Sequence, residues 1–225
     1  MQAIKTILFA FSVLITVTAL SQQPVISIGT DLAVLGSFKK DQRFLTFGQT
    51  LMFNVNFTQK DGAYVWYGYC APGKFHKDLE ATAKLPATTP QTLDFTSYSE
   101  ISLRHLSIGW KHYLVGAFNS EYSWNLYFAA GFGFVGGRVT NNFSIAADTA
   151  NYNFPSNPVN GNGKFKRLTF DASLGYEIPL GMSIYLYNDI RAWIPASDYP
   201  SKYLFVNDNA PFICTFNLGL RILFD

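Results

Sequence analysis

Apolar and polar residues alternate along several segments of the chain, as they do in β-strands with one nonpolar face. Segment 167–180 shows this most clearly, with Leu168 and Phe170 on one face and Asp171 and Glu177 on the other. The same period of two, in places less regular, occurs in segments 26–34, 45–57, 106–111, 125–134, 182–194 and 214–224. The pattern indicates an all-β protein.

Two segments fit this pattern less well. The third expected strand, 63–70, is short, and its apolar face is ambiguous. In the fourth, the apolar face changes side near Arg104 and His105, which predicts a β-bulge at that position.

The expected connections differ in length at the two ends of the strands. Short turns are expected at 59–62, 116–123 and 180–181, whereas the long connections are 72–96, 141–163 and 196–210. On the long side only the first connection, 37–43, is brief. This asymmetry is typical of outer-membrane barrels. We therefore predict an eight-stranded antiparallel up-and-down transmembrane β-barrel with short periplasmic turns and long extracellular loops.

Composition indicates which face of the barrel points outward. Charged residues make up 14% of the chain, whereas about 25% is usual in soluble proteins. An eight-stranded barrel has a narrow interior, which bulky residues from every strand would overfill. We therefore expect the Phe- and Leu-rich face to contact lipid and the Gly-, Ser- and Asn-rich face to line the lumen. A soluble ligand-binding barrel would have the opposite arrangement.

Trp and Tyr residues lie toward the ends of the expected strands, where interfacial aromatic girdles form in membrane barrels. The residues expected in these girdles are Tyr64, Trp66, Trp110, Tyr113, Trp124, Tyr176, Tyr185 and Trp193.

The N-terminus has the features of a cleaved signal peptide over residues 1–21, so the barrel is expected over residues 22–225. Lys5 precedes an apolar stretch, and Ala19 and Ser21 supply the small residues before the cleavage site. A retained N-terminal helix is the alternative. The net charge of +2 is too close to zero to favour a nucleic-acid partner. Cys70 and Cys214 fall on strands that are not neighbours, so we expect no disulfide between them.

The signal sequence, the eight strands and the terminal strand resemble the small outer-membrane barrels of the OmpA-type and general outer-membrane β-barrel families. The resemblance covers essentially the whole mature chain and implies location in a bacterial outer membrane. It also implies contact with membrane lipid and lipopolysaccharide, and insertion by the barrel-assembly machinery. That machinery reads a terminal aromatic residue, and here Phe224 is penultimate.

Charged residues gather on the expected inner face, where a narrow lumen requires each charge to have a partner. They are Asp31, Lys111, Arg167, Asp171, Glu177, Asp189, Arg191 and Arg221. Their signs nearly balance, which predicts a paired network that fills the lumen. A gated ion path is the alternative.

His105 and Ser107 share one strand face, so a base and a nucleophile could meet there. His-x-Ser resembles the motif of outer-membrane lipid A deacylases, whose third member here would be Glu100 or Glu121. No metal-ligand spacing links His76 or His112 to the cysteines, so neither a metal nor another cofactor is expected.

The long loops carry aromatic residues that could bind a surface ligand or partner. These candidates are Phe143, Tyr152, Phe154, Tyr199 and Tyr203. Packing of these rings on one another as a cap is the alternative. The sequence thus favours a non-enzymatic barrel with a filled lumen and a structural, adhesive or interaction role, ahead of a narrow pore or a lipid A-modifying enzyme.

Overall fold

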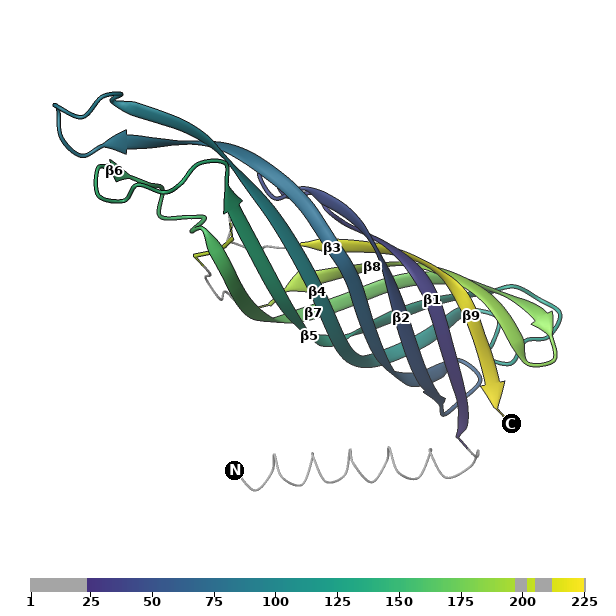
Figure 1. Cartoon of the computed structure of the whole chain (residues 1–225). Coiled ribbons are helices and arrows are strands. Elements are labelled where there is room, and N and C mark those ends of the chain that lie inside the picture. Colours follow the sequence, from purple (N-terminus) through teal and green to yellow (C-terminus); the bar gives the residue numbers. More distant parts are fainter. Residues whose placement is uncertain (1–23, 197–201, 205–211, 225) are drawn as a thin grey trace, which may run out of the picture.

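The computed structural model describes residues 24–196, 202–204 and 212–224, and the predicted signal peptide and Tyr199 lie outside them. The described residues form nine β-strands in one sheet (Figure 1). The strands are β1 (Val25–Ser37), β2 (Phe44–Asn56), β3 (Asp61–Ala83), β4 (Thr92–Val115), β5 (Asn125–Phe143), β6 (Tyr152–Asn153), β7 (Gly161–Gly181), β8 (Ile184–Pro195) and β9 (Ile213–Phe224).

Eight of these strands close into a ring, so the predicted eight-stranded up-and-down barrel is confirmed. The hydrogen-bonded order is β2-β1-β9-β8-β7-β5-β4-β3, and pairing of β2 with β3 closes the ring. All pairings are antiparallel. The short β6 adds only to the far end of β3, at Thr82 and Ala83. The described part of the chain contains no helix long and apolar enough to cross a membrane.

The two ends of the barrel differ as expected. One end carries the short connections 57–60, 116–124 and 182–183, together with the start of β1 and the end of β9 (Figure 1). The last of these turns lies two residues beyond its predicted position. Its central residues, Met182 and Ser183, have φ angles of 51° and 62°, as a type I′ hairpin turn requires.

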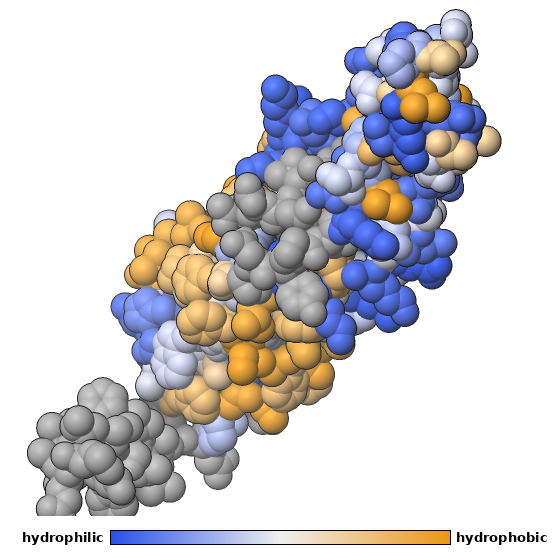
Figure 2. All heavy atoms as spheres, turned by 90° about the vertical axis from the view of Figure 1, so that its left-hand side faces the viewer, coloured by the Kyte–Doolittle hydropathy of each residue, from blue (hydrophilic) through white to orange (hydrophobic). Residues whose placement is uncertain are grey.

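The outer wall of the barrel is apolar, and its lumen is polar. Leu32, Leu45, Phe47 and Phe132 each expose two thirds or more of their surface on the outer wall. Figure 2 shows the apolar residues as a broad band over the barrel, below a predominantly polar protruding part. The inner face carries buried Ser, Thr, Asn and charged residues instead. The predicted orientation, with apolar residues outside, is confirmed.

The two faces exchange polarity toward the end with the long connections. In β4, Leu106 and Ile108 point outward, whereas Ile101 and Leu103 are buried inside and Arg104 points outward. Side chains of β4 alternate regularly from Ile101 to Ile108, and the register with both neighbours is continuous at Arg104 and His105, so the bulge predicted there is wrong. The change in pattern marks the height at which the outer surface stops being apolar.

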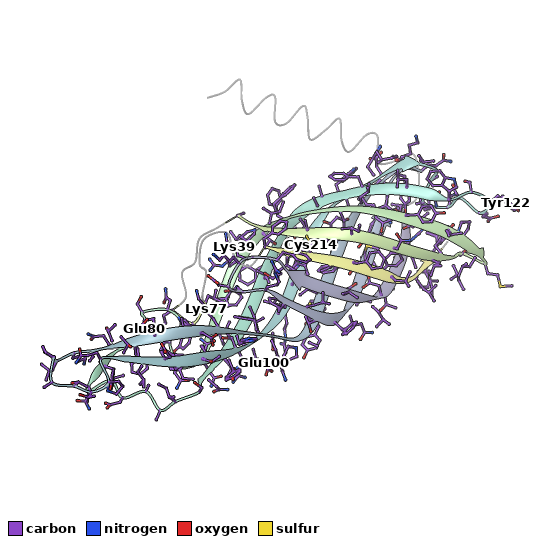
Figure 3. All side chains as sticks on the ribbon, turned by 90° about the horizontal axis from the view of Figure 1, so that it is seen from above. Lys39, Lys77, Glu80, Glu100, Tyr122 and Cys214 are labelled. Carbon is purple, nitrogen blue, oxygen red and sulfur yellow. The ribbon has the colours of Figure 1, made fainter. Side chains whose placement is uncertain are left out.

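The irregularity lies in β3 instead, where the register shifts between Cys70 and Gly73. Beyond this point β3 continues to Ala83, much further than predicted. Most of the predicted loop 72–96 is therefore a β-hairpin that protrudes from the barrel (Figure 1). Figure 3 places Lys77, Glu80 and Glu100 along this protruding half and Tyr122 at the opposite tip.

The predicted aromatic girdles are only partly correct. Trp110 and Trp124 are about half exposed on the outer wall, and the Tyr176 ring lies beside that of Trp124, with centroids 5.7 Å apart. The other residues point into the lumen and are almost completely buried: Tyr64, Trp66, Tyr113, Tyr185 and Trp193. They share the face of the polar residues, so the alternation of side chains overrides their preference for an interface.

The two cysteines are free. Cys70 is buried on the inner side of β3, whereas Cys214 is partly exposed on β9. Cys70 lies where the two faces have already exchanged polarity.

A charge placed within the apolar band should destabilise the protein in a bilayer. We expect Ile108→Arg to lower the free energy of unfolding from phospholipid vesicles by about 2–4 kcal/mol, because the guanidinium would face hydrocarbon. Tyr98→Arg, on the outer face of the same strand but in the protruding part, should change it by less than about 1 kcal/mol. Equal losses in urea titrations would contradict the assigned position of the band.

Candidate functional site

The lumen holds all eight charged residues that the sequence assigns to it. Each is at most 5% exposed, although they come from five different strands. Strict alternation along each strand turns these side chains inward, and the narrow ring then brings them together. They form three layers along the barrel axis.

The layer nearest the short turns is centred on Glu177 of β7. Lys111 Nζ donates to Glu177 Oε1 at 2.5 Å, and Arg221 Nη2 donates to Glu177 Oε2 at 2.9 Å. The Tyr113 hydroxyl donates to the same Oε2 at 3.1 Å. Arg221 also donates to the backbone carbonyl of Phe118 at 2.8 Å, which ties the 116–124 connection across the lumen. One carboxylate thus holds two cations at the end of the barrel.

Aromatic rings shield these cations. The Lys111 ammonium lies 3.6 Å from the centroid of the Tyr127 ring, and the Arg221 guanidinium lies 4.1 Å from that of Tyr185. Such contacts stabilise a desolvated cation in addition to its ion pair. Sequence reasoning missed this role of the lumen aromatics.

Glycines on neighbouring strands make room for these rings. A side chain at Gly175 would meet the Tyr127 ring at 2.1 Å, and one at Gly131 would meet the Tyr64 hydroxyl at 2.7 Å. The sequence contained this signal, because both glycines fall on the inner face of their alternating strands. A glycine facing inward in a narrow barrel indicates a large side chain packed against it inside the lumen.

The middle layer joins Asp31, Asp189 and Arg191. Arg191 Nη2 lies 3.6 Å from Asp189 Oδ2, and the Tyr187 hydroxyl donates to Asp31 at 2.7 Å. The Asn217 amide donates to the other oxygen of Asp189. The Arg191 guanidinium also lies over the rings of Tyr64 and Trp66, at 5.1 and 4.7 Å from their centroids.

The layer nearest the long connections contains His105 and Asp171. His105 Nε2 lies 2.9 Å from the Thr169 hydroxyl and 3.3 Å from Asp171 Oδ1. Its ring stacks on Trp193, with centroids 4.3 Å apart. Arg167 of the same layer is buried, with its guanidinium 5.9 Å from the Phe165 ring centroid.

His105 and Ser107 both face this sealed interior and are at most 1% exposed. The predicted third members do not join them, because Glu100 lies on the outer face of β4 and Glu121 is exposed in the 116–124 connection. Asp171 takes the place next to His105 instead. Neither the histidine nor the serine faces the lipid in which a lipid A substrate would lie.

An apolar plug lies above the third layer. It consists of buried side chains contributed by most strands of the ring, including Leu35, Phe44, Cys70, Phe75, Ile101, Leu103, Val135, Val139, Phe165, Leu204 and Ile213. Tyr203 packs against this plug. The lumen is therefore filled by charged and aromatic layers below and by hydrocarbon above.

The predicted loop aromatics pack on one another. Phe143 and Phe154 stack with centroids 6.1 Å apart, and both contact Phe95 of β4. Tyr152 is 8% exposed and donates to the carbonyl of Pro90. These rings form the small core of the protruding sheet, so the structure favours the cap over free binding residues.

Potential metal ligands are scattered in this structure. Across the described ranges, no three His, Cys, Asp or Glu side chains are grouped as metal ligands would be.

Comparison with known proteins identifies the architecture. No family model matches the chain, and no curated protein matches it. Among solved structures, OprG from Pseudomonas aeruginosa has a TM-score of 0.52 at 13% identity, covering 90% of this chain and 97% of that one. The attachment invasion locus protein Ail of Yersinia pestis, solved with the heparin analogue sucrose octasulfate, has a TM-score of 0.50 at 11% identity, covering 90% and 100%. The fold is that of the small outer-membrane β-barrels.

The layer around Glu177 yields a stability prediction. Glu177→Gln should lower the free energy of unfolding by about 3–5 kcal/mol, because Lys111 and Arg221 would remain buried without a carboxylate. Asp61→Asn, which removes an exposed partner of His112, should cost about 1 kcal/mol or less. Urea unfolding in lipid vesicles measures both values, and a small effect at Glu177 would show that the network does not hold the lumen together.

Proposed function

We propose that this protein is a closed barrel of a Gram-negative outer membrane whose activity resides in the sheet above the barrel. We propose an interaction or adhesion role that needs no catalysis. The filled lumen is the observation that carries the proposal, because three layers of charged and aromatic side chains and an apolar plug leave the barrel wall and the protruding strands as the accessible surfaces. The apolar outer wall supports the membrane location.

The protruding hairpin has the features of a docking element. From Gly73 to Ala83, β3 extends about 35 Å at the usual rise per residue. Its edge toward β2 is paired only up to Cys70, and β6 covers it only at Thr82 and Ala83 among the described residues. A free strand edge can bind a partner strand through its backbone groups.

Charges along this edge favour a selective partner. The outer face of β3 carries a charged or titratable residue at every second position: Lys74, His76, Asp78 and Glu80. Such charges on an edge strand prevent indiscriminate pairing between sheets. The hairpin also has its own core around Phe95, which stiffens it before any partner binds.

A narrow pore is the competing function, and conductance distinguishes it. The full chain in planar bilayers should show no steady open-state current of nanosiemens size. Arg221→Ala should leave the current unchanged, because the two upper layers and the apolar plug still close the lumen. A stable conductance in either protein would refute the closed barrel.

Truncation of the hairpin tests the interaction role. Residues 75–99 are replaced by Asn-Gly, which joins the directly paired Lys74 and Glu100. Cells displaying this variant should attach to epithelial cells no better than cells without the protein, while the barrel still assembles.

The control shortens only the tip, residues 84–91, and keeps the free edge of β3. It should attach as the full chain does. Attachment that survives removal of the whole hairpin would exclude the hairpin as the binding element.

A further inference from the structure

Four cations surround a groove on the outer wall, at the height where the apolar band ends. The groove has a volume of 480 Å³ and lies over β4, β5 and β7. Its lining includes Arg104, Arg138, Lys164 and Lys166, together with Tyr69, Ser102, Gly136, Gly137 and Phe165. The lumen networks do not involve these four cations, because their side chains point outward.

The strand register fixes the height of the groove. One row across the sheet runs through Tyr69, Arg104, Gly136 and Lys166, and the next row outward runs through Ser102, Arg138 and Lys164. The row immediately below consists of Tyr67, Leu106, Phe134 and Leu168, all exposed on the outer wall. Two residues along a strand span about 7 Å. The cations therefore begin about 7 Å along the strands from exposed hydrocarbon.

The positive charges of the groove are not balanced by acidic residues. Arg138 and Lys164 are direct cross-strand partners, and like charges in that relation destabilise a sheet. In the described part of the chain, none of the four cations of the groove makes a salt bridge. The next row outward brings Glu100, which lies directly opposite Lys74 in the register of β3 and β4. An anion from outside the chain would relieve the repulsion.

The floor of the groove is open. Gly136 lies between Arg104 and Lys166 in the first row, and a Cβ atom built on it would meet nothing within 4 Å. A side chain here would be accommodated by the fold and would occupy the hollow. The groove thus has cationic side chains on two sides and an open hollow over Gly136 between them.

We propose that this groove binds the phosphorylated headgroup of an outer-leaflet glycolipid of the lipid A class. Phosphate oxygens would accept hydrogen bonds from the guanidinium and ammonium groups, and the acyl chains would lie along the apolar row of Leu106, Phe134 and Leu168. The proposal rests on the outer-membrane location proposed above. It concerns a different surface from the β3 edge, so adhesion and lipid binding can fail independently.

The continuity between groove and apolar band favours a lipid over a soluble anion. A free phosphate or a sulfated glycan would use only the cations, whereas an amphiphile uses both the cations and the apolar row. The groove is also on the side of the barrel wall, below the protruding hairpin, where a membrane lipid would reach it laterally.

The test measures lipid A bound to the full chain by native mass spectrometry from detergent micelles. Arg138→Gln with Lys164→Gln should reduce bound lipid A at least about tenfold, the equivalent of about 1.4 kcal/mol. Gly136→Val keeps every charge but fills the hollow, and it should cause a similar loss. The matched control is Lys39→Gln with Lys40→Gln, which removes two cations from the β1–β2 turn on the opposite wall and should bind normally.

Ligand variants separate the possible sources of the anion. Lipid A without its phosphates should bind at least about tenfold more weakly, and soluble sucrose octasulfate should not displace the intact lipid. Equal binding of phosphorylated and dephosphorylated lipid would overturn the proposal, as would displacement by the soluble sulfate. Normal binding by Gly136→Val, with an intact barrel by heat-dependent gel migration, would also overturn it.

Discussion

The narrow lumen of an eight-stranded ring is the constraint on which this structure depends. Every inward side chain must fill space, and every buried charge must find a partner, since several kcal/mol per ion are otherwise lost. Glu177 meets this requirement for Lys111 and Arg221 at once. Tyrosine rings and hydroxyl groups contact the same charged groups, and inward glycines give those rings their space. This packing fills the lumen with side chains of the strands themselves.

The exchange of polarity between the two faces determines the rest of the architecture. Within the apolar band, Leu106 of β4 points outward and Ser107 points inward. Beyond the band, toward the long connections, Leu103 points inward and Arg104 points outward. Burial of apolar area then stabilises the interior, as it does in a soluble protein. This change lets β3 and β4 continue past the barrel as an independent sheet, because Phe95, Phe143 and Phe154 provide a core that the membrane no longer supplies.

Alternation, connection lengths and composition together predict the ring of strands, the outward apolar wall and all eight lumen charges. The prediction is wrong where one sequence pattern can have two physical causes. At Arg104 and His105, a change of apolar face was read as a bulge, although the strand is regular and only its surroundings change. The segment beyond Pro72 was read as a loop, because its strands are polar outside and too weakly apolar inside to stand out. Trp66 and Trp193 depart from the predicted girdles for a third reason. Strand phase, which the packing of the lumen obeys, outweighs the preference of these rings for a membrane interface.

The same energetics explain why the basic rows lie where they do. An Arg or Lys on the lipid face costs about 2–4 kcal/mol at the bilayer midplane and about 0–1 kcal/mol near the interface. Strand spacing puts the row of Arg104 and Lys166 one step above Leu106 and Phe134, at the edge of the apolar band, where that cost has nearly disappeared. The repulsion between Arg138 and Lys164 has not disappeared there, because the two side chains remain directly opposed. The membrane therefore permits these cations at this position, but their mutual repulsion disfavours it. An anion at the same height would relieve that repulsion, and the phosphate groups of lipids are anions of this kind.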